Sequence, residues 1–375
     1  MLRLTLASFG LLLSLPLLIT IHTLWFWKVT LLVGEYGHRL ALVTALLAWW
    51  CWRGKEVTAS LMALTATCIL LTPLLSAAWV AQKLPSQMEA AFGESVSGEP
   101  LAWKDLWLGW TTAKVAPREY QMEVTPSCPV VRRLLLYPAA SSQPAPVILV
   151  IHGGGWQNGS AEEFPGWSSQ WATEGYAVVS LDYRLAPKWT WPAPLDDVRD
   201  ALAYLRIHAA EMNVDADRVV LFGRSAGGQI ATAAAVQLRD PSIRGVVSLY
   251  APADMVFAHR FADPEDVLDS FKLIGQYMGG DPEKRPDLFQ SASATLTADS
   301  SCPPMLLVHG QRDILVWHLQ SSRLAEHLRQ QGVPHLFMDL PWATHAFDYA
   351  QHGPGSQLLR SALHGFLKTR LGPRE

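Results

Sequence analysis

One serine lies in a sequence context that would make it a nucleophile. Ser225 is the centre of a Gly-Arg-Ser-Ala-Gly stretch at 223–227, which follows an apolar run at 218–222 and precedes an alanine-rich helical pattern. A strand, a tight turn and a helix in this order form a nucleophile elbow, in which only small residues fit beside the serine. The sequence therefore predicts that the Ser225 hydroxyl stands above the edge of a sheet, where it could attack a carbonyl carbon.

Two residues later in the chain supply what a serine nucleophile needs, a base and a carboxylate that orients the base. His345 and Asp313 each lie in a loop after an expected strand, and the carboxyl ends of parallel strands meet at one edge of a sheet. Their order, Ser225 then Asp313 then His345, is that of the α/β-hydrolases. Asp348 stays an alternative acid because it is within reach of His345. His309 lies in an expected strand and is assigned a structural role.

A glycine-rich segment at 152–156, His-Gly-Gly-Gly-Trp, follows another expected strand. Acyl transfer needs N–H groups where negative charge develops on the carbonyl oxygen, and losing one such donor costs about 10²–10³ in rate. The backbone N–H groups of Gly153, Gly154 and Ala226 are the predicted donors of this oxyanion hole. The alternative is an ordinary glycine-rich turn, which is disfavoured because the segment lies one βαβ unit before the elbow.

The elements that must position these groups alternate along the second part of the chain. Helical stretches such as 194–210, 226–239 and 319–331 separate the later members of a series of short, β-rich runs. The expected strands lie at 130–137, 146–151, 177–182, 218–222, 245–250, 305–309 and 336–339. Alternating strands and helices predict an α/β fold, with a mostly parallel sheet covered by helices on both faces.

The region from about 147 to 349 resembles the hormone-sensitive-lipase-like and feruloyl-esterase-like carboxylesterases of the α/β-hydrolase superfamily. Four blocks carry the resemblance: the glycine-rich segment, residues 182–187 with 192–197, the elbow at 223–228, and the positions of Asp313 and His345. The resemblance implies a Ser-His-Asp triad that hydrolyses a small-molecule or lipid-like ester. It also implies structural roles for Arg184 and Asp197.

The sequence departs from that family in three places. Arg224 stands in the elbow where many relatives have an acidic or neutral residue, which would alter the charge at the rim of the site. Trp317 stands where relatives often have proline. The apolar N-terminus is not general to the family and is similar to its membrane-bound members, such as prenylcysteine methylesterases. That similarity is one of architecture, so it says little about the substrate.

The N-terminal part of the chain has the composition of a membrane segment. The first 82 residues contain only seven charged side chains, whereas the remainder has an ordinary globular composition. Apolar runs at 4–27, 36–52 and 57–81 approach or exceed the length that crosses about 30 Å of hydrocarbon, and tryptophans flank them. Three spans are favoured over two, and a cleaved signal peptide is the other alternative. Lys and Arg are balanced between the two sides, so sidedness stays open.

The chain thus divides into a membrane segment at 1–84, a connector at 85–119 and an α/β-hydrolase catalytic domain at 120–375. Residues 252–303 are too long for a simple loop and are expected to form a cap-like insertion. Helical spacing in the connector predicts one apolar face, which would pack on the domain or lie at the bilayer: Trp103, Leu106, Trp107 and Trp110. Because every predicted site residue follows His152, the membrane segment is expected to anchor the enzyme without contributing to catalysis.

An apolar substrate pocket near the site is expected to be lined by tryptophans, with core packing as an equal alternative for each: Trp156, Trp189, Trp191 and Trp342.

The net charge of −3 and the lack of a basic run argue against a nucleic-acid partner. No His, Cys or Asp cluster has the spacing of metal ligands, so no metal and no cofactor is expected. The same triad could cleave an amide or peptide bond. A membrane scaffold with an inactive hydrolase domain is disfavoured because the predicted triad is intact. The natural substrate and the oligomeric state stay undetermined.

Overall fold

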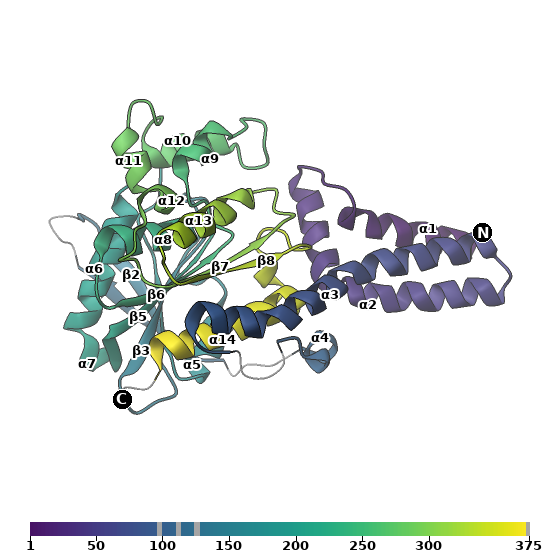
Figure 1. Cartoon of the computed structure of the whole chain (residues 1–375), viewed down its shortest axis with the longest axis horizontal. Coiled ribbons are helices and arrows are strands. Elements are labelled where there is room, and N and C mark those ends of the chain that lie inside the picture. Colours follow the sequence, from purple (N-terminus) through teal and green to yellow (C-terminus); the bar gives the residue numbers. More distant parts are fainter. Residues whose placement is uncertain (96–99, 110–113, 124–127, 373–375) are drawn as a thin grey trace.

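A computed structural model describes residues 1–95, 100–109, 114–123 and 128–372 (Figure 1). These residues contain an eight-stranded sheet in the order β1-β2-β4-β3-β5-β6-β7-β8. The strands are β1 Arg118–Met122, β2 Arg132–Tyr137, β3 Ala145–Ile151, β4 Ala177–Leu181, β5 Val214–Arg224, β6 Ile243–Leu249, β7 Met305–Gly310 and β8 His335–Leu340. The β1–β2 and β2–β4 pairs are antiparallel, and every pair from β4 across to β8 is parallel. The predicted α/β fold with a mostly parallel sheet is confirmed.

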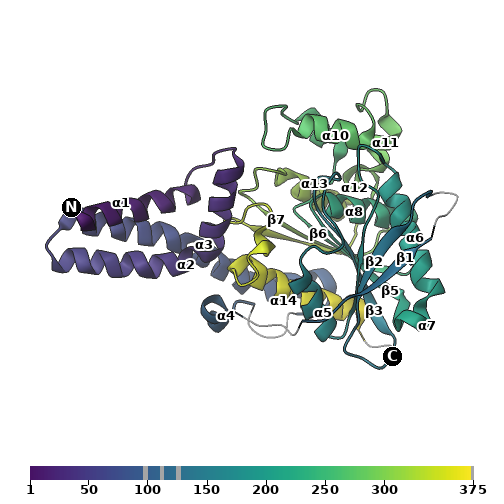
Figure 2. The ribbon, with the colours of Figure 1, turned by 180° about the vertical axis from the view of Figure 1, so that it is seen from behind.

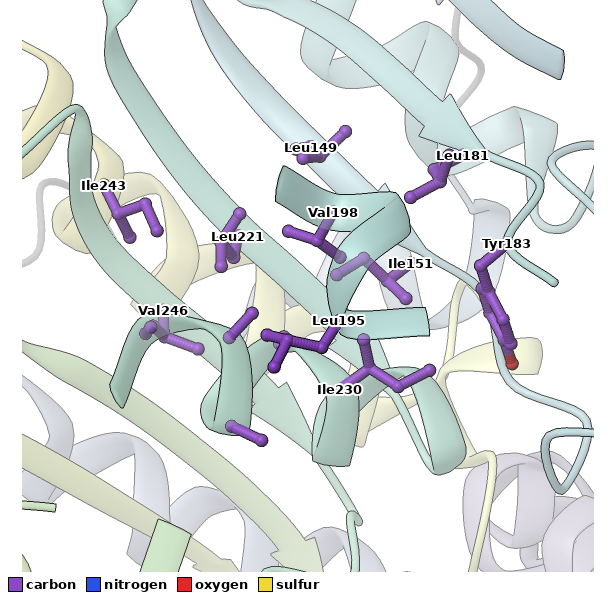
Figure 3. Packing of buried hydrophobic residues seen from close by; sticks show 14 of the residues in the cluster. Leu149, Ile151, Leu181, Tyr183, Leu195, Val198, Leu221, Ile230, Ile243 and Val246 are labelled. Carbon is purple, nitrogen blue, oxygen red and sulfur yellow. The ribbon is translucent and has the colours of Figure 1, made fainter. Parts of the chain in front are cut away.

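Helices cover both faces of the sheet because its central strands are apolar on both sides. One face packs against α6, α8 and α13, and the other against α3, α5 and α14. In Figure 3, Val198 of α6 and Ile230 of α8 lie over Leu221 and Ile151 of the central strands. Burial of each such side chain contributes about 1.5–3 kcal/mol.

The helices after the N-terminal segment are α4 Trp103–Leu108, α5 Pro165–Thr173, α6 Ala193–Ile207, α7 Ala209–Met212, α8 Ala226–Leu238, α9 Met255–Arg260, α10 Ser270–Met278, α11 Pro286–Ser291, α12 Ala294–Thr297, α13 Leu319–Gln330, η2 Phe347–Tyr349 and α14 Pro354–Leu371.

The insertion expected at 252–303 connects β6 to β7 and contains α9, α10, α11 and α12. Three of these helices, α9, α10 and α11, lie together beyond one end of the sheet (Figures 1 and 2). Buried Met255, Tyr277 and Phe289 join the insertion to the core of the sheet. It is therefore a layer packed on the domain, placed where it can cover residues at that end of the sheet.

The N-terminal helices differ from the expected spans. They are α1 Leu2–Ser14, η1 Leu15–Leu17, α2 Leu24–Arg53 and α3 Val57–Phe92. The expected span at 4–27 is not one helix, because Pro16 lies in the short 3₁₀ turn that ends the first helical segment. Helix α2 begins after Thr23, whose Oγ1 accepts a hydrogen bond from the Phe26 N–H over 3.3 Å. The expected span at 36–52 is the second part of α2.

Helix α3 serves two parts of the molecule. Its first half packs with α1 and α2 in a bundle that projects from the rest of the chain, and its second half lies along α14 (Figures 1 and 2). Leu84, Met88 and Phe92 belong to the core beneath the sheet. The expected boundary at residue 84 is wrong as a structural division, because it falls inside a helix that helps to cover the sheet.

The expected connector helix is the short α4. Leu106 is buried, and its carbonyl oxygen accepts hydrogen bonds from His38 Nε2 over 3.1 Å and from Arg39 Nη2 over 2.8 Å. Trp103 and Trp107 are exposed. Trp110 lies outside the described residues. Helix α4 thus packs on α2 through its backbone and Leu106, while two tryptophans face outwards.

Candidate active site

Ser225 occupies the sharp turn between β5 and α8. Its backbone has φ +52° and ψ −119°, a conformation that L-residues rarely adopt and that a nucleophile elbow requires. A Cβ on Gly223 would collide with the carbonyl oxygen of Gly227, and one on Gly227 would collide with that of Ile151. The glycines at both positions therefore allow the turn to close against β3, and the serine stands at the carboxyl end of β5.

The structure brings the three predicted triad residues together. His345 Nε2 lies 3.0 Å from Ser225 Oγ, and His345 Nδ1 lies 2.6 Å from Asp313 Oδ2. Asp313 follows β7 and His345 lies in the loop after β8, as their positions in the sequence predicted. With the Nδ1 proton directed at the carboxylate, Nε2 is left as an acceptor for the serine proton.

Asp313 is a buried carboxylate surrounded by donors. Its Oδ1 accepts hydrogen bonds from the backbone N–H groups of Leu315 and Val316 over 2.8 and 2.9 Å, and its Oδ2 lies 3.1 Å from His309 Nε2. Burial would raise the pKa of Asp313, but the neighbouring His345 and His309 outweigh burial and hold the pKa well below its usual range. The carboxylate is therefore ionised. His309, assigned a structural role from the sequence, contacts the acid directly.

Asp348, the alternative acid, is hydrogen-bonded to residues other than His345. Its two oxygens accept hydrogen bonds from Arg224 Nε and from the Tyr250 hydroxyl, each over 2.6 Å. Both Arg224 and Asp348 are buried. The expectation that Arg224 alters the rim charge is wrong, because its guanidinium is neutralised inside the protein. The geometry therefore favours Asp313 as the partner of His345.

The glycine-rich segment is held by its own histidine. The His152 ring stacks on Tyr183 with 4.2 Å between centroids, and its Nδ1 lies 2.8 Å from the carbonyl oxygen of Gly153. Burial lowers the pKa of His152, so the ring is neutral and Nδ1 carries the proton of this bond. Gly154 has φ +101°, which favours glycine. The Gly153 N–H donates to Glu163 Oε2 over 3.2 Å, so one predicted oxyanion donor is occupied by a carboxylate.

Two cavities adjoin Ser225. One, of about 170 Å³, is mainly apolar, with Trp156, Leu273 and Val316 among its walls. The other, of about 1060 Å³, includes Gly153, Gly154 and His345 as well as polar side chains such as Glu163. Ala226 follows the serine at the first position of α8 and lines the smaller cavity. Ser225 thus stands between two spaces that are both lined mainly by apolar atoms. Glu163 belongs to no motif, so no pattern in the sequence indicated that it lies at the site.

Only one of the four expected pocket tryptophans lines these cavities. Trp156 does so, and its Nε1 donates to Gln229 over 3.0 Å. Trp191 is buried in the core beside Ser291, and Trp189 lies against the guanidinium of Arg184. Trp342 is buried and donates to Glu35 of α2. For these three the contacts favour the alternative of packing on the fold over the pocket role, with Trp191 and Trp342 buried and Trp189 half-buried.

Arg184 and Asp197 have the structural contacts that the family resemblance implied. Asp197 is fully buried and accepts from Arg184 Nε and from Arg132 Nη1, each over 2.8 Å. A buried carboxylate needs such partners because an unpaired charge inside a protein is strongly destabilising. Through these contacts Asp197 joins the start of α6 to Arg132 of β2 and to Arg184 in the segment after β4.

The sequence matches the family model described as BD-FAE over residues 135–328, a range that includes Ser225 and Asp313 and ends before His345. Among curated proteins it is similar to esterase LipQ of Mycobacterium tuberculosis, with 29% identity over 249 residues, 63% of this chain and 58% of that protein. It is 30% identical to carboxylesterase NlhH of the same species over 241 residues, 58% of this chain and 74% of that protein. Ethyl acetate hydrolase of Pseudomonas putida is 30% identical over 215 residues, 53% of this chain and 65% of that protein.

The solved structures that resemble this chain share its fold. A bacterial heroin esterase superposes with a TM-score of 0.60 and 24% identity, covering 79% of this chain and 92% of that one. An esterase of Pyrobaculum calidifontis gives a TM-score of 0.59 and 20% identity, covering 77% and 94%. The chain spans 58% of LipQ and 65% of ethyl acetate hydrolase, so the match is to part of those proteins.

Proposed function

The chain belongs to the BD-FAE family and has the α/β-hydrolase fold, and we propose that it is a carboxylic-ester hydrolase held at a membrane by its N-terminal helices. The observation that carries the proposal is the series of contacts from Asp313 through His345 to Ser225, with distances of 2.6 and 3.0 Å. Similarity to proteins named as esterases supports the ester as the bond that is cleaved.

In this proposal Ser225 Oγ attacks the ester carbonyl carbon while His345 Nε2 takes the serine proton. Ionised Asp313 stabilises the imidazolium that forms. The alkoxide of the tetrahedral intermediate is stabilised by the N–H groups of Gly153, Gly154 and Ala226. The intermediate collapses as His345 returns the proton to the leaving alcohol, and water then hydrolyses the acyl-enzyme by the same steps in reverse order. The Glu163 carboxylate must leave the Gly153 N–H before the alkoxide can accept from it.

The packing of the N-terminal bundle supports the membrane part of the proposal. Away from its base, the interior is made mainly of small side chains and hydroxyls: Ala7, Gly10, Ala48, Ala59 and Ala63 are in or beside the contacts, and Thr44 Oγ1 lies 2.8 Å from Thr67 Oγ1. Leu17, Val33 and Leu70 are buried nearer the base, but many large apolar side chains are exposed: Leu4, Leu6, Phe9, Leu12, Leu42, Val43, Leu46, Leu61 and Leu64. A bundle in water buries its large apolar groups, whereas lipid solvates them and leaves small residues between the helices.

Two helices, α2 and α3, are long and apolar enough to cross a membrane by length and composition. The test of anchoring is extraction of membranes with alkaline carbonate. The full chain should stay in the pellet and be released by detergent. Recovery in the carbonate supernatant would show a peripheral or soluble protein and would contradict this part of the proposal.

The test of the chemistry is labelling by a fluorophosphonate probe, together with hydrolysis of p-nitrophenyl butyrate. Ser225→Ala should abolish both, with a loss of about 10⁴–10⁶ in kcat, because the hydroxyl is the nucleophile. Its melting temperature should stay close to that of the unchanged protein, which serves as the control for folding. Comparison with the p-nitroanilide of the same acyl chain, and separately with an N-aryl formamide, distinguishes an esterase from an amidase. A Ser225→Ala enzyme that still cleaves the butyrate ester would refute the mechanism.

A further inference from the structure

The N-terminal segment forms part of the wall of the apolar cavity beside Ser225. His22, in the segment between η1 and α2, lines this cavity together with Phe261, Leu268 and Trp317 from the other side. The segment is held there by Arg312, whose Nη2 donates to the carbonyl oxygens of Pro16 over 2.9 Å and Ile19 over 2.6 Å. The cavity is therefore enclosed between the base of the bundle and the insertion over the sheet.

The segments that border this cavity carry large apolar side chains that are exposed. On the N-terminal side they are Leu18, Ile19, Ile21, Leu24 and Trp25, and on the other side they are Phe261, Leu268, Phe271, Trp317 and Leu319. In both views the segment before α2 and the loop between α9 and α10 lie on the side from which the bundle projects (Figures 1 and 2). We call the exposed apolar residues of these segments the apolar rim; its N-terminal part and the loop between α9 and α10 lie on the same side of the molecule as the bundle.

The length of the bundle decides how close this rim comes to a membrane. Contacts with the rest of the chain reach Arg39 on α2 and begin again at Leu74 on α3. The projecting parts are thus about 16 residues of α1 with η1, about 14 of α2 and about 17 of α3, or roughly 21–26 Å at 1.5 Å per residue. Such a bundle is shorter than the hydrocarbon core of about 30 Å.

The tip of the bundle carries charged groups. Arg3 pairs with Glu56 over 3.3 Å, and Arg53 and Lys55 are exposed beside them. Charged groups are costly in hydrocarbon and stable only in an interface. For the tip to reach the far interface, the base of the bundle must enter the near interface. The apolar rim of the cavity lies at that base.

From these observations we propose that the mouth of the apolar cavity is immersed in the near leaflet, and that the substrate is a long-chain ester that enters from the lipid phase. This inference rests on the proposed ester hydrolysis by Ser225 and names its substrate class. The loop between α9 and α10 carries Asp263, Glu265 and Asp266, which disfavour an anionic surface and match a zwitterionic one such as phosphatidylcholine.

The test uses the full chain reconstituted in phosphatidylcholine vesicles and compares two esters. One is a fluorogenic oleoyl ester dissolved in the vesicles, and the other is p-nitrophenyl butyrate in the water phase. Ile21→Asn and Trp25→Gln alter rim residues that are 45% and 77% exposed. Each should lower kcat/KM on the oleoyl ester by about tenfold, because a polar group replaces one solvated by lipid, and should change the butyrate rate by less than about twofold.

Ile207→Asn is the matched control. Ile207 is 79% exposed at the end of α6, on the part of the catalytic domain far from the bundle (Figure 1), so this variant should change neither rate. Equal losses on both esters, or no loss on the oleoyl ester, would overturn the inference. A change in oligomeric state of the rim variants in detergent, without a selective loss on the oleoyl ester, would make the rim an interface between copies and would also overturn it. Absence of any Ser225-dependent butyrate hydrolysis would instead refute the proposed function.

Discussion

The Trp27 indole Nε1 donates a hydrogen bond to the carbonyl oxygen of His345 over 3.0 Å, across 318 residues of sequence. Glu35 of α2 makes two further hydrogen bonds: its Oε1 accepts from Trp342 Nε1 over 3.0 Å, and its Oε2 accepts from the Gly355 N–H over 2.9 Å. Helix α2 therefore holds the loop that carries His345 at two positions, His345 and Trp342, and the start of α14 at a third, Gly355. The N-terminal segment, expected from the sequence only to anchor the chain, positions the proposed catalytic base.

Trp27→Phe should reveal this role. The ring volume is largely kept, but the His345 carbonyl loses a partner, at a cost of about 1 kcal/mol. We expect kcat on p-nitrophenyl butyrate to fall about three- to tenfold with little change in KM, because the base is less well held while the substrate cavity is intact. Trp25→Phe, at an exposed neighbour, is the control. A rise in KM at unchanged kcat would contradict a positioning role.

A chain that begins near Pro85 retains every proposed site residue, and the sequence alone predicts it to be active. The structure leads to the opposite expectation, because this cut removes Leu84 and the contacts of α2 with Trp342 and His345. We expect the truncated protein to aggregate or to lose butyrate hydrolysis. Deletion of residues 2–14, which removes α1 alone, should leave that activity within about threefold in detergent, since α1 packs mainly on α2 and α3 within the bundle. A soluble, fully active chain from Pro85 would show that the helices are dispensable.

Asp313→Asn and Asp348→Asn should fail in different ways. Asn at 313 presents His345 with the wrong tautomer, and we expect kcat to fall about 10⁴-fold with the fold retained. Asn at 348 leaves the buried Arg224 guanidinium without its counter-charge, which should cost about 3–5 kcal/mol of stability. Thermal unfolding and kcat per folded molecule distinguish the two. If Asp348→Asn is stable and inactive while Asp313→Asn is active, the assignment of the acid is reversed.

The lowered pKa of Asp313 makes a prediction about stability and pH. Folding favours the ionised carboxylate, so its contribution is fully present above the unfolded-state pKa, near about 3.9, and is lost as the pH falls through the lower folded-state value. The difference in melting temperature between the unchanged protein and Asp313→Asn should therefore shrink as the pH falls below about pH 4. A difference that already disappears between pH 7 and pH 6 would mean that another group controls it.

The sequence by itself determined the parts that depend on local chemistry. The elbow at Ser225 could be predicted from the sequence because a tight turn from strand to helix excludes side chains at Gly223 and Gly227. The sheet could be predicted because buried parallel strands need short apolar runs, whatever packs on them. Ser225, Asp313 and His345 could be placed at one edge of that sheet because each follows the carboxyl end of an expected strand.

Only the tertiary structure decided between groups of the same type. The sequence allowed either Asp313 or Asp348 to be the acid that orients His345. In the structure the buried Arg224 donates a hydrogen bond to Asp348, which leaves Asp313 as the partner of His345. Hydropathy could not divide α3 either: its first half packs in the N-terminal bundle with α1 and α2, and its second half covers the sheet. Both halves are apolar, since lipid and protein interior both favour apolar side chains. What an apolar side chain contacts is set by parts of the chain far away in sequence, and a linear pattern carries no information about them.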